Sequence, residues 1–204
     1  MSLAALLKDI RACRACADDL PHEPRPVLRA SSSAKVLIVG QAPGTRVHES
    51  GIPFTDPSGE RLRAWMGVSE DEFYDEAKVA IVPMGFCFPG LDAKGGDKPP
   101  LKRCAELWRD AVMAQLSSVA LTLVIGQYAQ AWHLGKQRKK SLTATVEAWQ
   151  DYGPELIPLP HPSWRNNGWI KRHPWFESDL VPHLQARIDR LLRGEHRGVF
   201  QSGS

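Results

Sequence analysis

Long hydrophobic runs are missing from this sequence of 204 residues. Glutamine, serine and threonine side chains interrupt its longest nearly apolar stretch, residues 111–128. Residues 1–10 are too short for a secretory leader and contain Lys8 and Asp9. We therefore expect neither a membrane span nor a signal peptide, and predict a cytoplasmic protein with no membrane partner.

A strong excess of one charge is also missing. Lysine and arginine number 26 against 23 acidic residues, a formal net charge of +3. That surplus is too small to demonstrate nucleic-acid binding, but its distribution matters more. Positive charge gathers at residues 136–140 and 171–173, whereas acid collects at 70–76. Such asymmetry permits a basic face toward phosphate.

Two nucleotide-binding signatures are missing as well. A glycine-rich loop ending in Gly-Lys-Ser/Thr is absent, and no GxGxxG follows an apolar run. Both absences disfavour nucleotide hydrolysis and dinucleotide chemistry. The composition, 43% hydrophobic and 24% charged, is that of a soluble globular protein. We predict one domain over residues 1–195 and a frayed polar tail at 196–204.

Cysteine is scarce, with four residues, Cys13, Cys16, Cys87 and Cys104. Without a secretory signal, a disulfide framework is disfavoured. The Cys13–Cys16 pair can chelate one metal centre, and four thiolates suit tetrahedral zinc and an iron–sulfur cluster equally well. The alternative is that Cys87 and Cys104 are ordinary buried thiols.

Four short aliphatic runs are present, and they predict buried parallel strands at 35–40, 79–82, 121–126 and 156–159. Amphipathic stretches at 59–66 and 104–116 predict helices between them. This alternation indicates an α/β fold with a parallel sheet. Ligands bind at the carboxyl ends of such strands, so the loops after Gly40, Val82, Gly126 and Leu159 are expected to share one site.

Two of these loops carry residues suited to chemistry. The first, Gly40-Gln-Ala-Pro-Gly44, can aim backbone amides at an anion or a carbonyl oxygen. The last strand exits into His161, held between two prolines. Trp164, Arg165, Lys171 and Arg172 follow, mixing cations with stacking surfaces as nucleic-acid grooves do.

These loops, in this order, resemble the uracil-DNA glycosylase superfamily. Gly40-Gln-Ala-Pro-Gly44 resembles its first motif and His161-Pro-Ser-Trp-Arg-Asn166 its last, and the cysteine spacing is similar to that of its iron–sulfur branch. The resemblance extends from Cys13 to about Trp175. It implies a three-layer α/β/α sandwich with a central, mainly parallel four-stranded sheet. It also implies a [4Fe–4S] cluster on the four cysteines and a monomeric repair enzyme that removes uracil from single- or double-stranded DNA.

The resemblance also implies roles for individual residues. His161 donates to the oxygen of the departing base, Phe54 stacks on that base, and Asp56 handles the attacking water, with His48 as the second candidate. Substrate contacts are expected at Gly40, Gln41, Ala42, Pro43, Gly44, Phe54, Met84 and Asn166. DNA contacts are expected at Ser163, Trp164, Arg165, Lys171 and Arg172, with Arg165 or Trp164 filling the gap left by the flipped base.

The sequence departs from the family at two places. Ala42 stands where the best-known branch has its water-activating aspartate, and Val47 and His48 follow where the iron–sulfur branch usually shows acids. Pro83 replaces the asparagine that reads uracil in relatives. Either backbone groups at 83–85 read the base or another deaminated base is preferred.

Two other functions remain open at this point. The first is a non-catalytic nucleic-acid-binding iron–sulfur protein of the same fold. The second is a redox or zinc module built on the Cys13–Cys16 pair, which leaves both loop motifs unexplained.

Overall fold

Four parallel strands form the centre of the molecule in the order β2-β1-β3-β4. The computed structural model describes residues 2–194, so the tail predicted at 196–204 lies outside the described residues. The strands are β1 (Val36–Val39), β2 (Val79–Ile81), β3 (Leu121–Ile125) and β4 (Leu156–Leu159). Each lies within one residue of its predicted bounds, and the predicted parallel sheet is confirmed.

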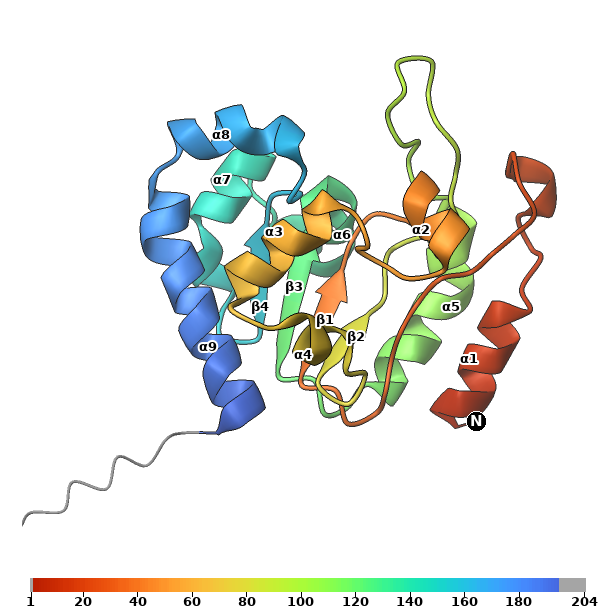
Figure 1. Cartoon of the computed structure of the whole chain (residues 1–204), viewed down its shortest axis with the longest axis horizontal. Coiled ribbons are helices and arrows are strands. Elements are labelled where there is room, and N and C mark those ends of the chain that lie inside the picture. The colour runs from red at the N-terminus through yellow and green to blue at the C-terminus, as the bar shows by residue number, and fades with distance from the viewer. Residues whose placement is uncertain (1, 195–204) are drawn as a thin grey trace, which may run out of the picture.

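The strands are apolar because both faces of the sheet are covered. The register aligns Ile38 with Leu123, and Leu123 with Ile157. These side chains point to one face, while the next residues along, such as Leu37 and Val124, belong to a second core on the opposite face. The expected three-layer α/β/α sandwich is confirmed (Figure 1).

Nine α-helices surround the sheet within residues 2–194. They are α1 (Leu3–Arg11), α2 (Thr45–Ser50), α3 (Pro57–Met66), α4 (Glu70–Tyr74), α5 (Lys102–Gln115), α6 (Gly126–Leu134), α7 (Leu142–Glu147), α8 (Asn167–Arg172) and α9 (Val181–Arg193). Shorter turns are the 3-10 helices η1 (Ala17–Asp19), η2 (Gly135–Gln137), η3 (Trp149–Tyr152) and η4 (Trp164–Asn166), and the π-helical turn η5 (Phe176–Leu180).

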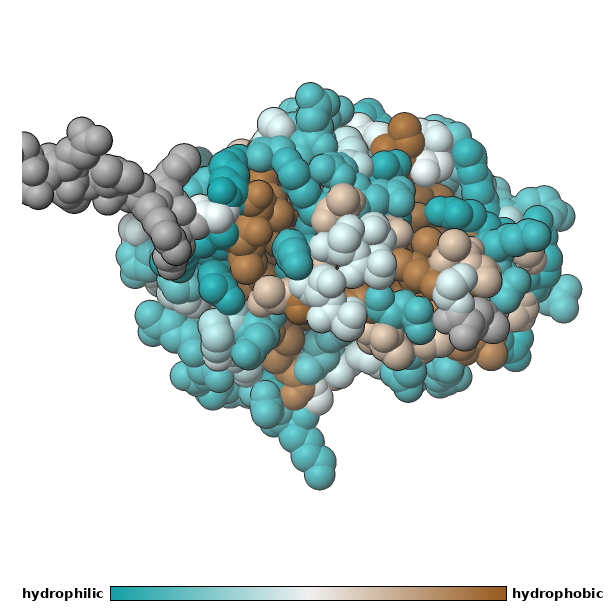
Figure 2. Space-filling view, turned by 90° about the horizontal axis from the view of Figure 1, so that it is seen from below, coloured by the Kyte–Doolittle hydropathy of each residue, from teal (hydrophilic) through white to brown (hydrophobic). Residues whose placement is uncertain are grey.

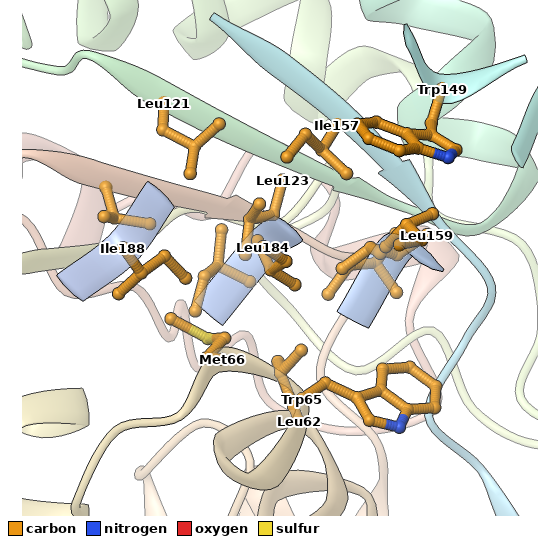
Figure 3. Packing of buried hydrophobic residues seen from close by; sticks show 14 of the residues in the cluster. Leu62, Trp65, Met66, Leu121, Leu123, Trp149, Ile157, Leu159, Leu184 and Ile188 are labelled. Atoms are coloured by element: carbon orange, nitrogen blue, oxygen red, sulfur yellow. The ribbon is translucent and has the colours of Figure 1, made fainter. Parts of the chain in front are cut away.

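Each face of the sheet has its own helices. On one face, Leu62, Trp65 and Met66 of α3 pack with Leu184 and Ile188 of α9 (Figure 3). On the other face, the core is completed by apolar residues of α1 and α5. This packing fixes the strands, and therefore fixes the loops at their carboxyl ends.

The surface at the amino ends of the strands is mostly hydrophilic, with narrow apolar strips between the polar side chains (Figure 2). Within residues 2–194, no helix has the length and apolar character that a bilayer crossing requires.

Candidate active site

A pocket opens at the carboxyl edge of the sheet, where sequence analysis expected it. Its walls include residues 40–44 after β1, Pro83 after β2 and His161 after β4. The loop after β3 was also expected here, but among the described residues it is not part of the lining. The reason is local, because the chain enters α6 directly at Gly126.

The loop after β1 is joined to the loop after β2. The carbonyl of Gly40 accepts from the amide of Met84 at 2.9 Å, and that of Gln41 accepts from Gly85 at 3.0 Å. These bonds continue the parallel pairing beyond the strand ends. They hold the start of the 40–44 loop against the loop after β2.

The ring of Phe54 lies in the pocket in a strained, well-supported conformation. Phe54 has a left-handed backbone, with φ of 57°, which is uncommon for a bulky residue. The Tyr74 hydroxyl donates to the carbonyls of Pro53 and Phe54, at 2.9 and 3.1 Å. A Cβ on Gly59 would lie 1.9 Å from the Phe54 carbonyl oxygen, so only glycine permits this arrangement.

Asp56 lines the pocket and also caps α3. Its Oδ1 accepts from the amides of Ser58 and Gly59, at 3.1 and 3.3 Å, and from the Ser58 hydroxyl. Asp56 therefore has a structural role at the start of α3 as well as a place in the pocket. The same carboxylate stands 105 positions before His161 in the chain yet borders the same pocket.

His161 is oriented by its own loop. The amide of Ser163 donates to His161 Nδ1 at 3.2 Å, and Asn166 Nδ2 donates to the His161 carbonyl at 2.7 Å. Burial lowers the pKa of His161, although the carboxylates of Asp56 and Asp97 oppose that shift. A neutral imidazole that accepts at Nδ1 carries its proton on Nε2. His161 therefore offers the pocket a hydrogen-bond donor.

A buried arginine supports the pocket from behind Pro83. Arg109 is fully buried, and its guanidinium donates to the carbonyls of Val82 and Pro83, at 3.3 and 3.0 Å. With the amides of Met84 and Gly85 already paired, three polar groups of the 83–85 backbone have partners. The two amides are therefore occupied, whereas the Pro83 carbonyl oxygen keeps a second acceptor position.

Three predicted residues lie elsewhere. His48 packs its ring against His22 and Phe88, with centroids 5.0 and 5.8 Å away, and the pocket lining drawn from residues 2–194 does not include it. The Met84 side chain is buried in the second core. Asn166 supports the His161 loop through the bond described above.

Asp97 is a pocket residue that sequence reasoning missed. It lies in the loop between β2 and α5 and borders the pocket with Asp56 and His161. Its only sequence signal is an acid within the glycine- and proline-rich segment 95–100. It lies far along the loop after β2, so the strand-end rule located its loop but did not single out Asp97 itself.

The predicted DNA-contacting residues follow His161 along the chain. The Trp164 side chain is 71% exposed, and the Arg165 guanidinium lies 5.8 Å from its ring centroid. The Ser163 hydroxyl accepts from the amide of Arg165 at 3.3 Å and caps η4. Lys171 and Arg172 are exposed on α8.

The four cysteines line one apolar hollow between α1, the loop after β2 and the start of α5. Trp108 Nε1 donates to Cys13 Sγ at 3.4 Å, and the Phe86 amide donates to Cys104 Sγ at 3.3 Å. Burial raises the pKa of Cys87 to about 11 and that of Cys104 to about 12. Across residues 2–194, no three side chains are arranged to hold a single metal ion.

Comparison with known proteins gives one family match. Residues 29–185, more than half of the chain, match the model of the Uracil DNA glycosylase superfamily. That range includes both loop motifs, whereas Cys13 and Cys16 precede it. Among solved structures, the chain is similar to Pedobacter heparinus SMUG2, with 19% identity and a TM-score of 0.34, over 77% of this chain and 72% of that one.

Proposed function

The chain belongs to the uracil DNA glycosylase superfamily, and from this premise we propose that it is a DNA repair hydrolase that cleaves the N-glycosidic bond of uracil, or a related deaminated base, in DNA. One observation carries the proposal. The Ser163 amide fixes His161 with its donor nitrogen free, in the pocket that the 40–44 loop and Phe54 also line.

This arrangement suits the bond that must break. When the bond between C1′ and the base nitrogen breaks, the electron pair leaves with the base, which becomes an anion while the sugar becomes cationic. Preorganised donors lower that barrier by meeting the charge as it develops. His161 Nε2–H supplies such a donor to a carbonyl oxygen of the departing base. Its neutral state suits a group that donates without losing its proton.

The target base must leave the duplex to reach this pocket. The Phe54 ring, fixed by Tyr74 and Gly59, offers the face on which a flipped base stacks. Trp164 and Arg165 lie on the same loop as His161, so they are placed to occupy the vacancy while His161 contacts the base. DNA is the partner that this combination fits.

We also propose that the four cysteines hold a [4Fe–4S] cluster, as the resemblance to the iron–sulfur branch of the family implies. In a [4Fe–4S] cluster each thiolate binds a different iron, so its ligands stand farther apart than those of one ion. The four thiols line one hollow, as the ligands of such a cluster would. The N–H groups of Trp108 and Phe86 resemble the sulfur hydrogen bonds that tune such clusters. Bound there, the cluster would join the Cys13–Cys16 segment to the Cys87–Cys104 segment as a structural support.

A base-release assay tests the proposal. Single-turnover reactions with oligonucleotides carrying one uracil, single- and double-stranded, should yield free uracil and an abasic site. Parallel oligonucleotides carrying hypoxanthine measure base preference. If DNA binds but no base is released from any substrate, the non-catalytic binding protein is the correct interpretation.

A further inference from the structure

The loop between β2 and α5 is a preformed hairpin that carries Asp97. Leu91 and Asp97 form an antiparallel bridge, and the Lys98 amide donates to the Gly90 carbonyl at 2.9 Å. At the tip, Asp92 Oδ1 accepts from the amides of Lys94 and Gly96, at 2.8 and 2.9 Å. These bonds set the path of the backbone at Asp97 within a hairpin that projects beside α2 (Figure 1).

The hairpin is attached to the first motif loop. Gln41 Nε2 donates to the Lys98 carbonyl at 2.9 Å. Asp97 Oδ2 lies 3.4 Å from the place where a Cβ on Gly44 would stand, so any larger side chain at 44 would compete with the carboxylate. Asp97 thus places a carboxylate beside the 40–44 loop. That loop has no acidic side chain of its own, because position 42 is alanine.

The other carboxylate of the pocket already has a structural task. Asp56 Oδ1 accepts three bonds from the first turn of α3, and moving it would expose the helix end. Burial raises the pKa of Asp97, which lies among the charges of several surrounding side chains. Of the two acids, Asp97 is the one not committed to capping a helix.

We propose that Asp97 is the catalytic residue that holds and deprotonates the attacking water, in place of the acid missing at Ala42. This inference rests on the glycosylase function proposed above. As the bond from C1′ to the base nitrogen breaks, its electron pair stays on the base. The water oxygen forms a new bond to C1′, and the water proton moves to the Asp97 carboxylate. The negative charge of Asp97 also faces the cationic sugar.

The charges around Asp97 make this role dependent on pH. Burial raises the pKa of Asp97, and Asp56 at the start of α3 and Asp92 in the same hairpin raise it further. Arg165 in η4 lowers it, as does His161 after β4 when its ring is protonated. Asp97 must be deprotonated to accept the proton of the water. The cleavage rate is therefore expected to fall as pH decreases through the raised pKa of Asp97.

Four proteins test the assignment under single-turnover conditions with saturating uracil-containing single strands: wild type, Asp97→Asn, Asp56→Asn and Asp71→Asn. Asp97→Asn should slow cleavage by about 100-fold or more with unchanged DNA affinity, and should flatten the acid limb of the pH profile. Asp56→Asn keeps a good capping side chain, so it should lose less than about tenfold. Asp71→Asn removes an equal charge from an exposed position on α4 and should match wild type.

A chemical-rescue arm separates catalysis from folding. Asp97→Ala should regain activity when formate is added, because formate restores a carboxylate to the vacated space, whereas a misfolded variant would not respond. The assignment is overturned if Asp97→Asn cleaves at the wild-type rate. It is also overturned if Asp56→Asn loses more activity than Asp97→Asn. If wild type itself releases no base, the proposed function fails instead, and the two failures are distinguishable.

Discussion

At the scale of single residues, the orientation of His161 follows from one backbone hydrogen bond. The Ser163 amide donates to Nδ1, and burial disfavours the imidazolium. A protonated ring would have to turn an N–H toward an amide that is itself a donor. The loop sequence His161-Pro-Ser163 therefore selects both the protonation state and the tautomer.

Replacing His161 by alanine should mainly affect the chemical step. Loss of one donor to a developing oxyanion typically slows a reaction by about 100- to 1,000-fold. Single-turnover rates on saturating uracil-containing DNA should fall by that amount, while the dissociation constant for the DNA changes little. Asn166→Ala, which removes only the bond to the His161 carbonyl, should cause a smaller loss. An unchanged rate in His161→Ala would remove the main support for the mechanism.

His133 should make folding stability sensitive to acid. Burial and the adjacent Arg109 cation lower its pKa to about 4, whereas an unfolded histidine titrates at about 6.5. Between these values the unfolded chain binds the extra proton, so the free energy of unfolding decreases as pH falls. Urea denaturation at pH 7 and pH 5 measures this.

The matched variant is His133→Gln, whose side-chain oxygen can still accept from Arg109 but does not titrate. It should have a lower free energy of unfolding than wild type at pH 7. The difference in free energy between the two proteins should be smaller at pH 5. A gap that stays constant across this range would show that His133 does not cause the acid sensitivity.

At the scale of elements, strands and motif loops were predictable, while the supports of the pocket were not. Aliphatic runs ended by glycine located β1 and β3, and the strand-end rule placed residues 40–44 and His161 in one site. Asp97 and Arg109 depend on tertiary contacts, since one lies on a hairpin and the other reaches across the sheet edge from α5. His48 was wrongly expected in the pocket from its position after the first motif. In the structure, α2 turns its ring toward His22 and Phe88 instead.

The two chain segments that carry the cysteines, 13–16 and 87–104, should bind iron. Anaerobically purified protein should be brown, with a broad absorbance at about 400 nm. It should contain iron and inorganic sulfide in equal amounts, as a [4Fe–4S] cluster does. Cys104→Ser should lose most of the iron. Stoichiometric zinc in a colourless, anaerobic sample would contradict the cluster.

Trp108→Phe is the control for that experiment, because it keeps the ring and removes the N–H that donates to Cys13 Sγ. It should retain iron but shift the reduction potential to a lower value, since a sulfur hydrogen bond stabilises the reduced cluster. If both variants lose iron equally, the hollow is sensitive to packing and the cysteine result alone does not identify a ligand.

At the scale of the whole molecule, the residues that we propose to contact DNA lie on one continuous segment. His161 lies at its start in the pocket, Trp164 and Arg165 follow on η4, and Lys171 lies farther along on α8. The Arg61 side chain donates to the Ser163 carbonyl at 3.1 Å and joins this segment to α3. In the proposed function, the same short stretch of chain would therefore contact the flipped base and fill the stack that the base has left.

Arg165→Ala should therefore weaken binding to duplex DNA more than to single strands. A side chain that fills a vacancy has one to fill only in a duplex, so we expect about a tenfold loss of duplex affinity and little loss on single strands. Lys171→Ala is the matched control. Removal of a simple phosphate contact should weaken binding to duplex and to single-stranded DNA alike, and should reduce the slope of log affinity against log salt concentration by about one. Both dissociation constants are best measured in the His161→Ala background, where cleavage is slow. Equal losses on the two substrates would make Arg165 a phosphate contact and leave the wedge to the exposed ring of Trp164.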